Sequence, residues 1–235
     1  MRERTYILQI ETATPVCSVA VSQNGETIAL MEADGANLHA SHLTLFIEQV
    51  LADVALSLDD LSAVAVSMGP GSYTGLRIGV STAKGLCYAL DIPLLAVPTL
   101  EAMVYGYVTQ GKIPALKDVK LVPMIDARRM EVYMMVFNAK LDILGETEAR
   151  IIDATSFSDA AQETPYILFG SGADKFEPIF EEDKAVCVES GFRNSASFLS
   201  TPASERFEQG RFEDVIYFEP YYLKDFIATT PKKRS

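Results

Sequence analysis

A glycine-rich turn between an apolar strand and a helix constrains this chain more than any other feature of its sequence. Gly69-Pro-Gly-Ser-Tyr-Thr-Gly75 follows an apolar run, residues 61–67, and precedes a helical pattern over residues 76–90. Backbone N–H groups in such a turn can cradle an anion, or the small residues can let the helix lie close to a sheet. The turn lacks a P-loop lysine and the Gly-x-Gly-x-x-Gly spacing, so the residues leave both interpretations open.

A nucleotide phosphate, if one binds this chain, has a small set of candidate ligands. Acidic and hydroxyl side chains follow the first predicted strand, where actin-like phosphotransferases hold a phosphate. Pro15 removes one N–H from that turn and no glycine follows the acid, so the motif is half present. The weak candidates for cofactor binding are Glu11, Thr12, Gly69, Gly71 and Ser72.

The pattern of apolar segments predicts an α/β fold with two lobes. The opening predicts three strands, with the hairpin signal Asn24-Gly25, and then helices alternating with strands. The three-strand opening partly recurs, with strands expected over residues 121–125, 131–137 and 141–144, after a break over residues 110–118. We therefore expect an N-terminal lobe at 1–108, a second lobe at 109–212 and a C-terminal segment at 213–235 that packs back on a lobe.

The charge distribution argues against direct binding of nucleic acid. The formal net charge is −12, and no Lys or Arg stands between Arg4 and Arg77, a stretch with eight Asp or Glu. Nucleic-acid affinity comes mostly from cations that neutralise phosphates. The basic run Lys232-Lys233-Arg234 is interpreted as a solvated end. Contact with RNA, if it occurs, is therefore expected through another protein.

Cysteine and histidine usage predicts neither disulfides nor a metal centre. Cys17, Cys87 and Cys187 form no pair and lie in core-like patterns, which favours a cytoplasmic protein with buried thiols. No apolar run is long enough to span a membrane. His39 and His42 could share a metal, but no third ligand follows on that face within two turns, so a plain pair of helix-start histidines is the better interpretation.

Two predicted helices, 39–56 and 76–90, have outer faces suited to a partner. The second helix carries small residues at four-residue steps, and such a stripe lets another helix approach closely. Together the two helices could pair with two others as a four-helix bundle, or could simply cover the sheet and meet solvent. Arg77 is expected in a structural ion pair rather than on a phosphate. The candidate interface residues are His39, His42, Phe46, Gln49, Arg77, Ser81, Gly85 and Ala89.

Several motifs together resemble the bacterial TsaB (YeaZ) family. They comprise Ile7-Leu-Gln-Ile-Glu-Thr-Ala-Thr14, His42 at a helix start, Gly69–Gly79, Ile125-Asp-Ala-Arg-Arg-Met-Glu-Val-Tyr133 and Tyr222-Leu-Lys224. The resemblance implies an actin-like fold of two similar lobes, each with a mixed sheet flanked by helices. It also implies a cytoplasmic role in making threonylcarbamoyladenosine at position 37 of tRNAs that read codons beginning with A.

The same resemblance implies a non-catalytic subunit that binds the catalytic relative TsaD. That enzyme holds its metal with an H-x-x-x-H motif, and the matching positions here are Thr99 and Met103, which are poor ligands for a divalent metal. The resemblance further implies an ATPase partner, TsaE, homodimers when the chain is alone, and contact with tRNA only through the complex. Possible weak nucleotide binding at the partner interface remains open. The alternative is an autonomous actin-fold phosphotransferase or ATPase that uses Glu11, Thr12 and the glycine-rich turn.

Overall fold

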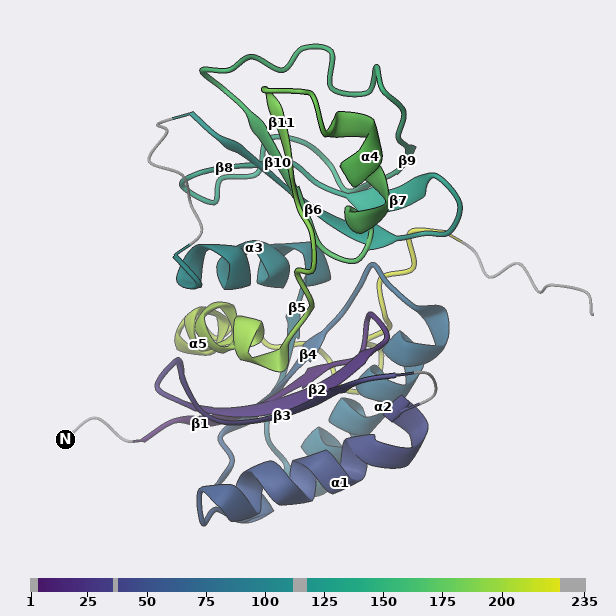
Figure 1. The fold of residues 1–235 in the computed structure, drawn as a ribbon. Helices are drawn as coiled ribbons and strands as arrows, with labels where there is room; N and C mark the ends of the chain where they lie inside the picture. The colour runs from purple at the N-terminus through teal and green to yellow at the C-terminus, as the bar shows by residue number, and fades with distance from the viewer. Residues whose placement is uncertain (1–3, 36–37, 112–117, 225–235) are drawn as a thin grey trace, which may run out of the picture.

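The computed structural model describes residues 4–35, 38–111 and 118–224, and it shows two lobes that are each built on one β-sheet (Figure 1). The first sheet has the strand order β3-β2-β1-β4-β5. Its strands are β1 Tyr6–Glu11, β2 Val16–Gln23, β3 Glu26–Asp34, β4 Ala63–Ser67 and β5 Leu94–Val97. Strand β1 pairs antiparallel with β2 and parallel with β4, so hairpins build one half of the sheet and helical crossovers build the other.

The second sheet repeats this arrangement. Its order is β11-β10-β6-β7-β9, with β8 paired to β6. The strands are β6 Lys120–Asp126, β7 Glu131–Met134, β8 Phe137–Asn138, β9 Glu148–Ile151, β10 Tyr166–Phe169 and β11 Val186–Glu189. Strand β6 is antiparallel to β7 and parallel to β10, as β1 is to β2 and β4. The two similar mixed sheets confirm the predicted α/β, actin-like class.

Helices α1 and α2 cover the outer face of the first sheet (Figure 1). The helices are α1 Leu38–Asp53, α2 Tyr73–Leu90, α3 Thr99–Thr109, α4 Glu177–Phe180 and α5 Ser200–Glu208. Apolar side chains of α1 and α2 share one core with the β1 side chains Leu8 and Ile10. Because both helices bury only one stripe, their opposite faces meet solvent.

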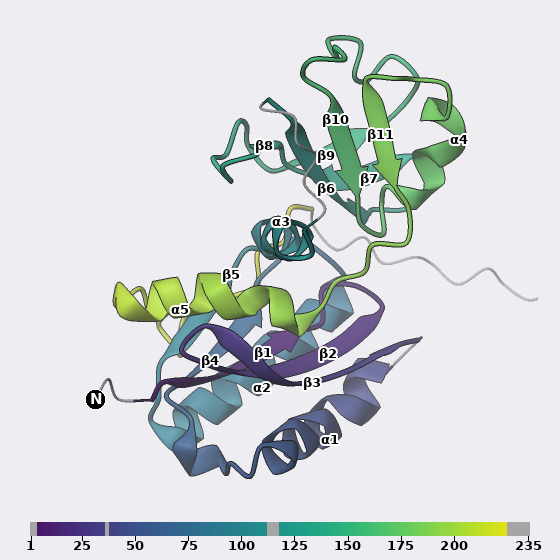
Figure 2. The same ribbon diagram turned by 60° about the vertical axis from the view of Figure 1, so that its left-hand side comes forward.

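Helix α3 lies between the two lobes, with α5 beside it (Figure 2). One face of α3, which includes Met103 and Tyr107, packs on Leu121 and Ile125 of the second sheet. Another side, through Ala102, joins the core under the first sheet. Contact on both sides explains why α3 is apolar almost all round. Helix α5 also packs on β1 and β5 of the first sheet. The predicted lobe boundaries after residues 108 and 212 stay a proposal.

The last described segment runs back along the first lobe and then reaches the second. The Glu213 N–H donates to the Leu94 carbonyl, and the Tyr221 N–H donates to the Met68 carbonyl. Farther on, Lys224 pairs with Glu131 on β7. We call residues 213–224 the strap. Residues 225–235, including the basic run 232–234, and residues 112–117 of the expected break lie outside the described part of the chain.

The structure corrects two sequence predictions. The third strand of the second lobe is β9, not residues 141–144, because the Asn138 side chain accepts N–H bonds from Lys140 and Asp142 and closes a turn there. Cys187 is exposed, unlike Cys17 and Cys87, because it lies on the edge strand β11 with one face uncovered. In the described residues, no helix is long and apolar enough to cross a membrane.

The glycines of α2 differ sharply in their surroundings, which yields a matched pair of variants. A Cβ at Gly75 would overlap the Thr12 carbonyl oxygen, whereas a Cβ at Gly85 would meet nothing within 4 Å. We expect Gly75→Ala to lower the free energy of unfolding by about 2 kcal/mol. Gly85→Ala should raise it by up to about 1 kcal/mol, through helix propensity alone. Urea denaturation measures both, and equal effects would contradict this packing.

Candidate functional site

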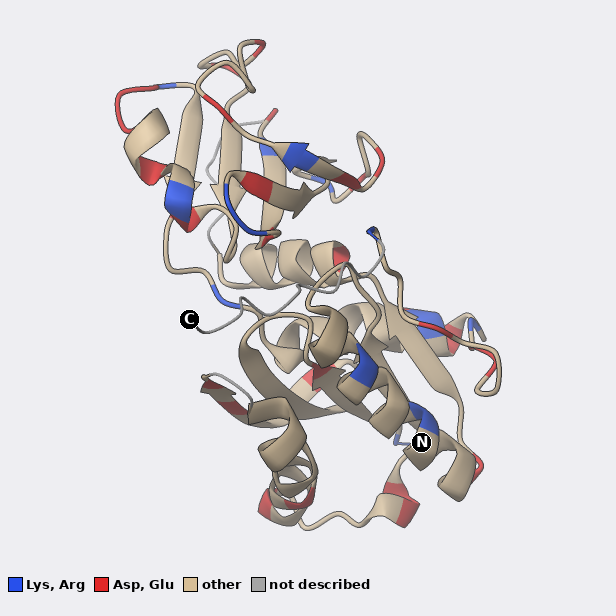
Figure 3. Cartoon of the chain, turned by 90° about the vertical axis from the view of Figure 1, so that its right-hand side faces the viewer, with Lys and Arg blue, Asp and Glu red and all other residues tan. Residues whose placement is uncertain are grey.

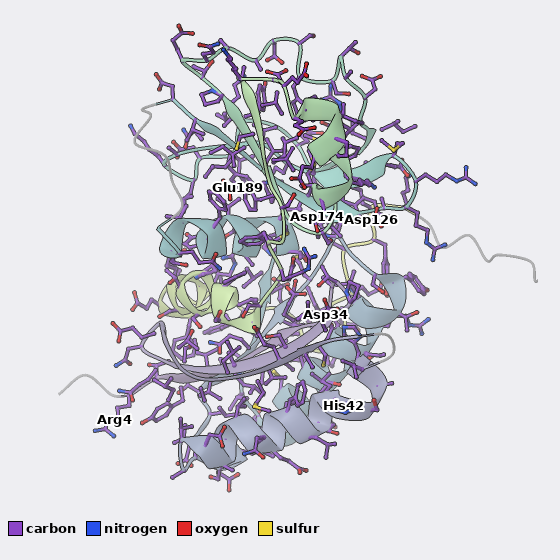
Figure 4. All side chains as sticks on the ribbon, viewed as in Figure 1. Arg4, Asp34, His42, Asp126, Asp174 and Glu189 are labelled. Carbon is purple, nitrogen blue, oxygen red and sulfur yellow. The ribbon has the colours of Figure 1, made fainter. Side chains whose placement is uncertain are left out.

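A cavity of about 750 Å³ lies between the lobes. The turn after β1, the start of α2, the β6–β7 turn and the strap all contribute to its lining. Asp126 and Asp174 reach its edge from the second lobe and Asp34 from the first, and Figure 4 shows the three on the same side of the molecule. The cavity is where the two halves of the fold could enclose a small ligand.

Glu11 lies under the floor of this cavity, at the end of β1. Its side chain is 1% exposed, and one carboxylate oxygen accepts the Ala13 N–H at 2.6 Å. Burial raises the pKa of the Glu11 carboxyl to about 7, although the Ala13 N–H and the nearby Ser67 and Asn194 side chains lower it. In the part of the chain that the structure describes, no Lys or Arg forms an ion pair with Glu11, so no cation there holds this buried acid ionised.

Three further polar side chains near Glu11 are buried and have polar atoms without a hydrogen-bond partner among residues 4–35, 38–111 and 118–224. They are the Thr12 and Thr14 hydroxyls and both polar atoms of Asn194. Asn194 is close enough to lower the pKa of Glu11, yet neither of its polar atoms makes a hydrogen bond of normal geometry. Each buried polar group without a hydrogen bond lowers the stability of the fold. Such groups call for an explanation, for example a water molecule or an ion that supplies the missing hydrogen bond.

Three N–H groups of the glycine-rich turn are used within the protein. The Ser72 N–H donates to the Ala13 carbonyl at 2.7 Å, and the Gly75 N–H donates to the Ser72 hydroxyl. The Gly69 N–H donates to the Thr99 hydroxyl. A Cβ at Gly71 would stand 2.5 Å from the Ala13 oxygen. These contacts support the close-packing interpretation of the turn.

Charges around the cavity are paired across short distances. Lys175 binds Asp126 at 2.5 Å, Arg193 binds Asp174 at 2.8 Å, and Lys224 of the strap binds Glu131. The Tyr222 ring packs against Tyr73, with 4.7 Å between ring centroids. Because each of these acids has a cation beside it, the charges around the cavity lining nearly balance, and the strap occupies part of the mouth.

The predicted interface residues lie away from this cavity, on the outer helices. His42 is on α1, on the far side of the sheet from Asp126 (Figure 4). It bonds the Ser41 hydroxyl and packs edge-on against Phe46, while His39 bonds the Val16 carbonyl. The two histidines therefore point to different partners. Arg77 is exposed and lies over the Tyr73 ring, 5.6 Å from its centroid. Within the described ranges it makes no ion pair with an acid, unlike the sequence expectation.

The small-residue stripe of α2 faces solvent. Ser81, Gly85 and Ala89 are all exposed, and so is Gln49 of α1, while Phe46 is half-buried. Leu45 of α1 is 54% exposed. The stripe and α1, which contacts α2, therefore lie on the outer side of the first lobe.

Comparisons with known proteins agree with this geometry. The family model described as "TsaD: tRNA N6-adenosine threonylcarbamoyltransferase" matches residues 33–199. The TsaB protein of Escherichia coli, named for tRNA threonylcarbamoyladenosine biosynthesis, is 28% identical over 94% of this chain and 96% of its own length. The Bacillus subtilis TsaB is 34% identical over 59% of this chain and 57% of its own. The chain belongs to the TsaB (YeaZ) family.

A solved structure supports the fold. YeaZ from Pseudomonas aeruginosa superposes with a TM-score of 0.77 at 24% identity, covering 93% of this chain and all of that one. Agreement at this identity concerns the arrangement of helices and strands. It extends over both lobes of the TsaB fold described above.

Thr99 and Met103, which the family resemblance aligns with a metal motif, are built into packing. The Thr99 hydroxyl bonds the Ser67 hydroxyl at 2.7 Å, and Met103 is fully buried against the second sheet. Among the described residues, no three His, Cys, Asp or Glu side chains gather closely enough to hold a metal ion.

Sequence reasoning missed several residues that the structure brings forward. Asn194 reaches Glu11 from 183 residues away along the chain, and Lys84 binds two carbonyls of the strap. No local motif marks either residue, because their neighbours are set by tertiary packing. Helical spacing could have identified Tyr88 as a surface residue, because Tyr88 follows Lys84 by four residues and extends the outer face of α2 by one turn.

The buried acid gives a pH prediction. A carboxyl with a raised pKa in the folded state stabilises the protein fully below its unfolded pKa and less as pH rises through the folded pKa. We expect the free energy of unfolding to fall by about 3 kcal/mol between about pH 4.5 and 7 on account of Glu11. Glu11→Gln should remove that component, which urea denaturation across this range measures. An unchanged pH profile in the variant would contradict the assignment.

Proposed function

We propose that the chain is a non-catalytic subunit in the synthesis of threonylcarbamoyladenosine on tRNA. In this role it binds the threonylcarbamoyltransferase TsaD and stabilises the competent form of that enzyme. The observation that carries the proposal is the exposed stripe Ser81, Gly85 and Ala89 on α2 beside α1. A Cβ at Gly85 would meet nothing within 4 Å, so a helix of another protein can approach the α2 backbone closely there.

The interior of the molecule supports a role without chemistry of its own. Thr99 and Met103 are committed to packing, and three N–H groups of the glycine-rich turn, those of Gly69, Ser72 and Gly75, bond within the chain. The names of the relatives support the pathway, since the Escherichia coli protein is called a tRNA threonylcarbamoyladenosine biosynthesis protein.

The charge distribution supports indirect contact with tRNA. Helix α1 carries acidic residues and no Lys or Arg, and Figure 3 shows the few basic residues of the first lobe scattered rather than gathered in one stripe. A net charge of −12 with this pattern is unfavourable for binding the phosphates of a nucleic acid. We therefore assign tRNA binding to the rest of the complex. From the family resemblance we also propose that the ATPase TsaE is a second partner, that the chain forms a homodimer when it is alone, and that it is located in the cytoplasm.

A bulky side chain at Gly85 tests the docking surface. Gly85→Leu should weaken binding of purified TsaD by about tenfold or more, because the added atoms separate the helices. The fold should persist, since the site faces open space. Gly145→Leu is the matched control, because a Cβ at this second-lobe glycine also meets nothing within 4 Å. Calorimetric titration measures affinity, and equal affinity of the Gly85→Leu variant and the wild type would contradict the proposed surface.

The alternative, an autonomous phosphotransferase or ATPase, rests on the interlobe cavity and on Glu11. Nucleotide binding and hydrolysis by the isolated chain decide between the two functions. We expect neither tight binding nor turnover of ATP. Micromolar affinity with hydrolysis that Glu11→Gln abolishes would favour the alternative.

A further inference from the structure

The strap holds two large apolar side chains out in solvent. Its neighbours Val215 and Phe218 turn inward and pack on the core under α2. Between them, Ile216 is 71% exposed and Tyr217 is 80% exposed. Two anchored residues therefore flank two presented ones, which is unlike a loose terminal segment.

The backbone at this point is fixed by charged groups on both sides. The Asp214 carboxylate accepts the Ile216 N–H at 2.8 Å and the Tyr217 N–H at 3.1 Å. The Lys84 ammonium donates to the Ile216 carbonyl at 3.1 Å and to the Phe218 carbonyl at 2.8 Å. Because the segment is already ordered, little conformational entropy would be lost when a partner covers it.

These side chains continue the outer face of α2. Tyr88 follows Lys84 by one helical turn and is 81% exposed, and it stands beside Gly85 and Ala89 of the stripe. Among the described residues, Tyr88, Tyr217 and Ile216 are the three most exposed large apolar side chains. We call these three residues the anchor patch. Tyrosine and other large apolar residues are enriched where interfaces derive most of their affinity.

The charge around the anchor patch favours a partner of the opposite sign over a second copy. Residues 213–219 contain three acidic side chains, Glu213, Asp214 and Glu219, and no basic one. The nearby cation Lys84 is already bound to carbonyls. Two copies meeting through this surface would bring like charges together, which costs affinity, whereas a basic rim would gain it.

We propose that the anchor patch is the second half of the surface that binds the threonylcarbamoyltransferase, and that it fits an apolar groove with a basic rim on that enzyme. The inference rests on the proposed function. It adds the strap to α1 and α2 as a region that contacts the enzyme. The strap begins 123 residues after the end of α2 in the sequence. It also gives Lys84 a positioning role, since this residue holds the strap carbonyls in place.

Truncation of the patch tests the proposal by titration with the purified enzyme. The double variant Ile216→Ala and Tyr217→Ala should weaken binding by about tenfold or more, because interface anchors of this type account for much of an affinity. Added salt should weaken wild-type binding through the charged rim. The control changes Ile143 and Ile151 to Ala, since these are 59% and 68% exposed on the second lobe, and should bind within about twofold of wild type.

Each outcome has a separate meaning. If the wild type does not bind the enzyme, the proposed function fails and the inference falls with it. If Gly85→Leu weakens binding but the strap double variant binds like wild type, the inference alone is overturned. Loss of self-association in the double variant with unchanged enzyme affinity would assign the patch to a second copy and overturn the proposal. Circular dichroism and urea denaturation establish that each variant is folded.

Discussion

The close contact between the start of α2 and the turn after β1 determines much of this molecule. Gly71 and Gly75 let the α2 backbone approach Ala13 and Thr12 at distances that a Cβ would forbid. The same contact binds the Ser72 N–H to the Ala13 carbonyl, so an N–H that could have faced an anion is used internally. By holding one side of α2 against the sheet, the contact also turns the stripe with Gly85 toward solvent. The glycines of this turn therefore serve the close packing of α2 on the first sheet.

The interior between the lobes, in contrast, contains buried polar groups as well as apolar ones. Glu11, Thr12 and Asn194 bury polar atoms where the two sheets approach each other, and several of these atoms have no partner. The cost is offset elsewhere in the fold, for example by the apolar contacts of α3, which packs on both lobes. Such a cluster makes stability depend on pH without requiring any catalytic role for the carboxyl.

The outer surface and the strap suggest how an enzyme-like scaffold can act through contact. Helix α2 presents small residues where a helix could pack, and the strap presents Ile216 and Tyr217 beside it on a backbone that Lys84 and Asp214 immobilise. Acidic side chains around this surface select against a like-charged partner. Affinity would then come from the apolar area of the anchor patch. The choice of partner would come from the acidic side chains around it.

Local periodicity and glycine content were enough to predict the α/β class, the duplicated strand opening and the special nature of residues 69–79. The sequence could not place the third strand of the second lobe, since the Asn138 side chain closes a turn there that apolar periodicity does not register. Nor could it join Asn194 to Glu11 or Lys84 to the strap. Those neighbours are far apart along the chain, and only the packing of one lobe against the other, and of the strap along α2, decides which polar groups meet.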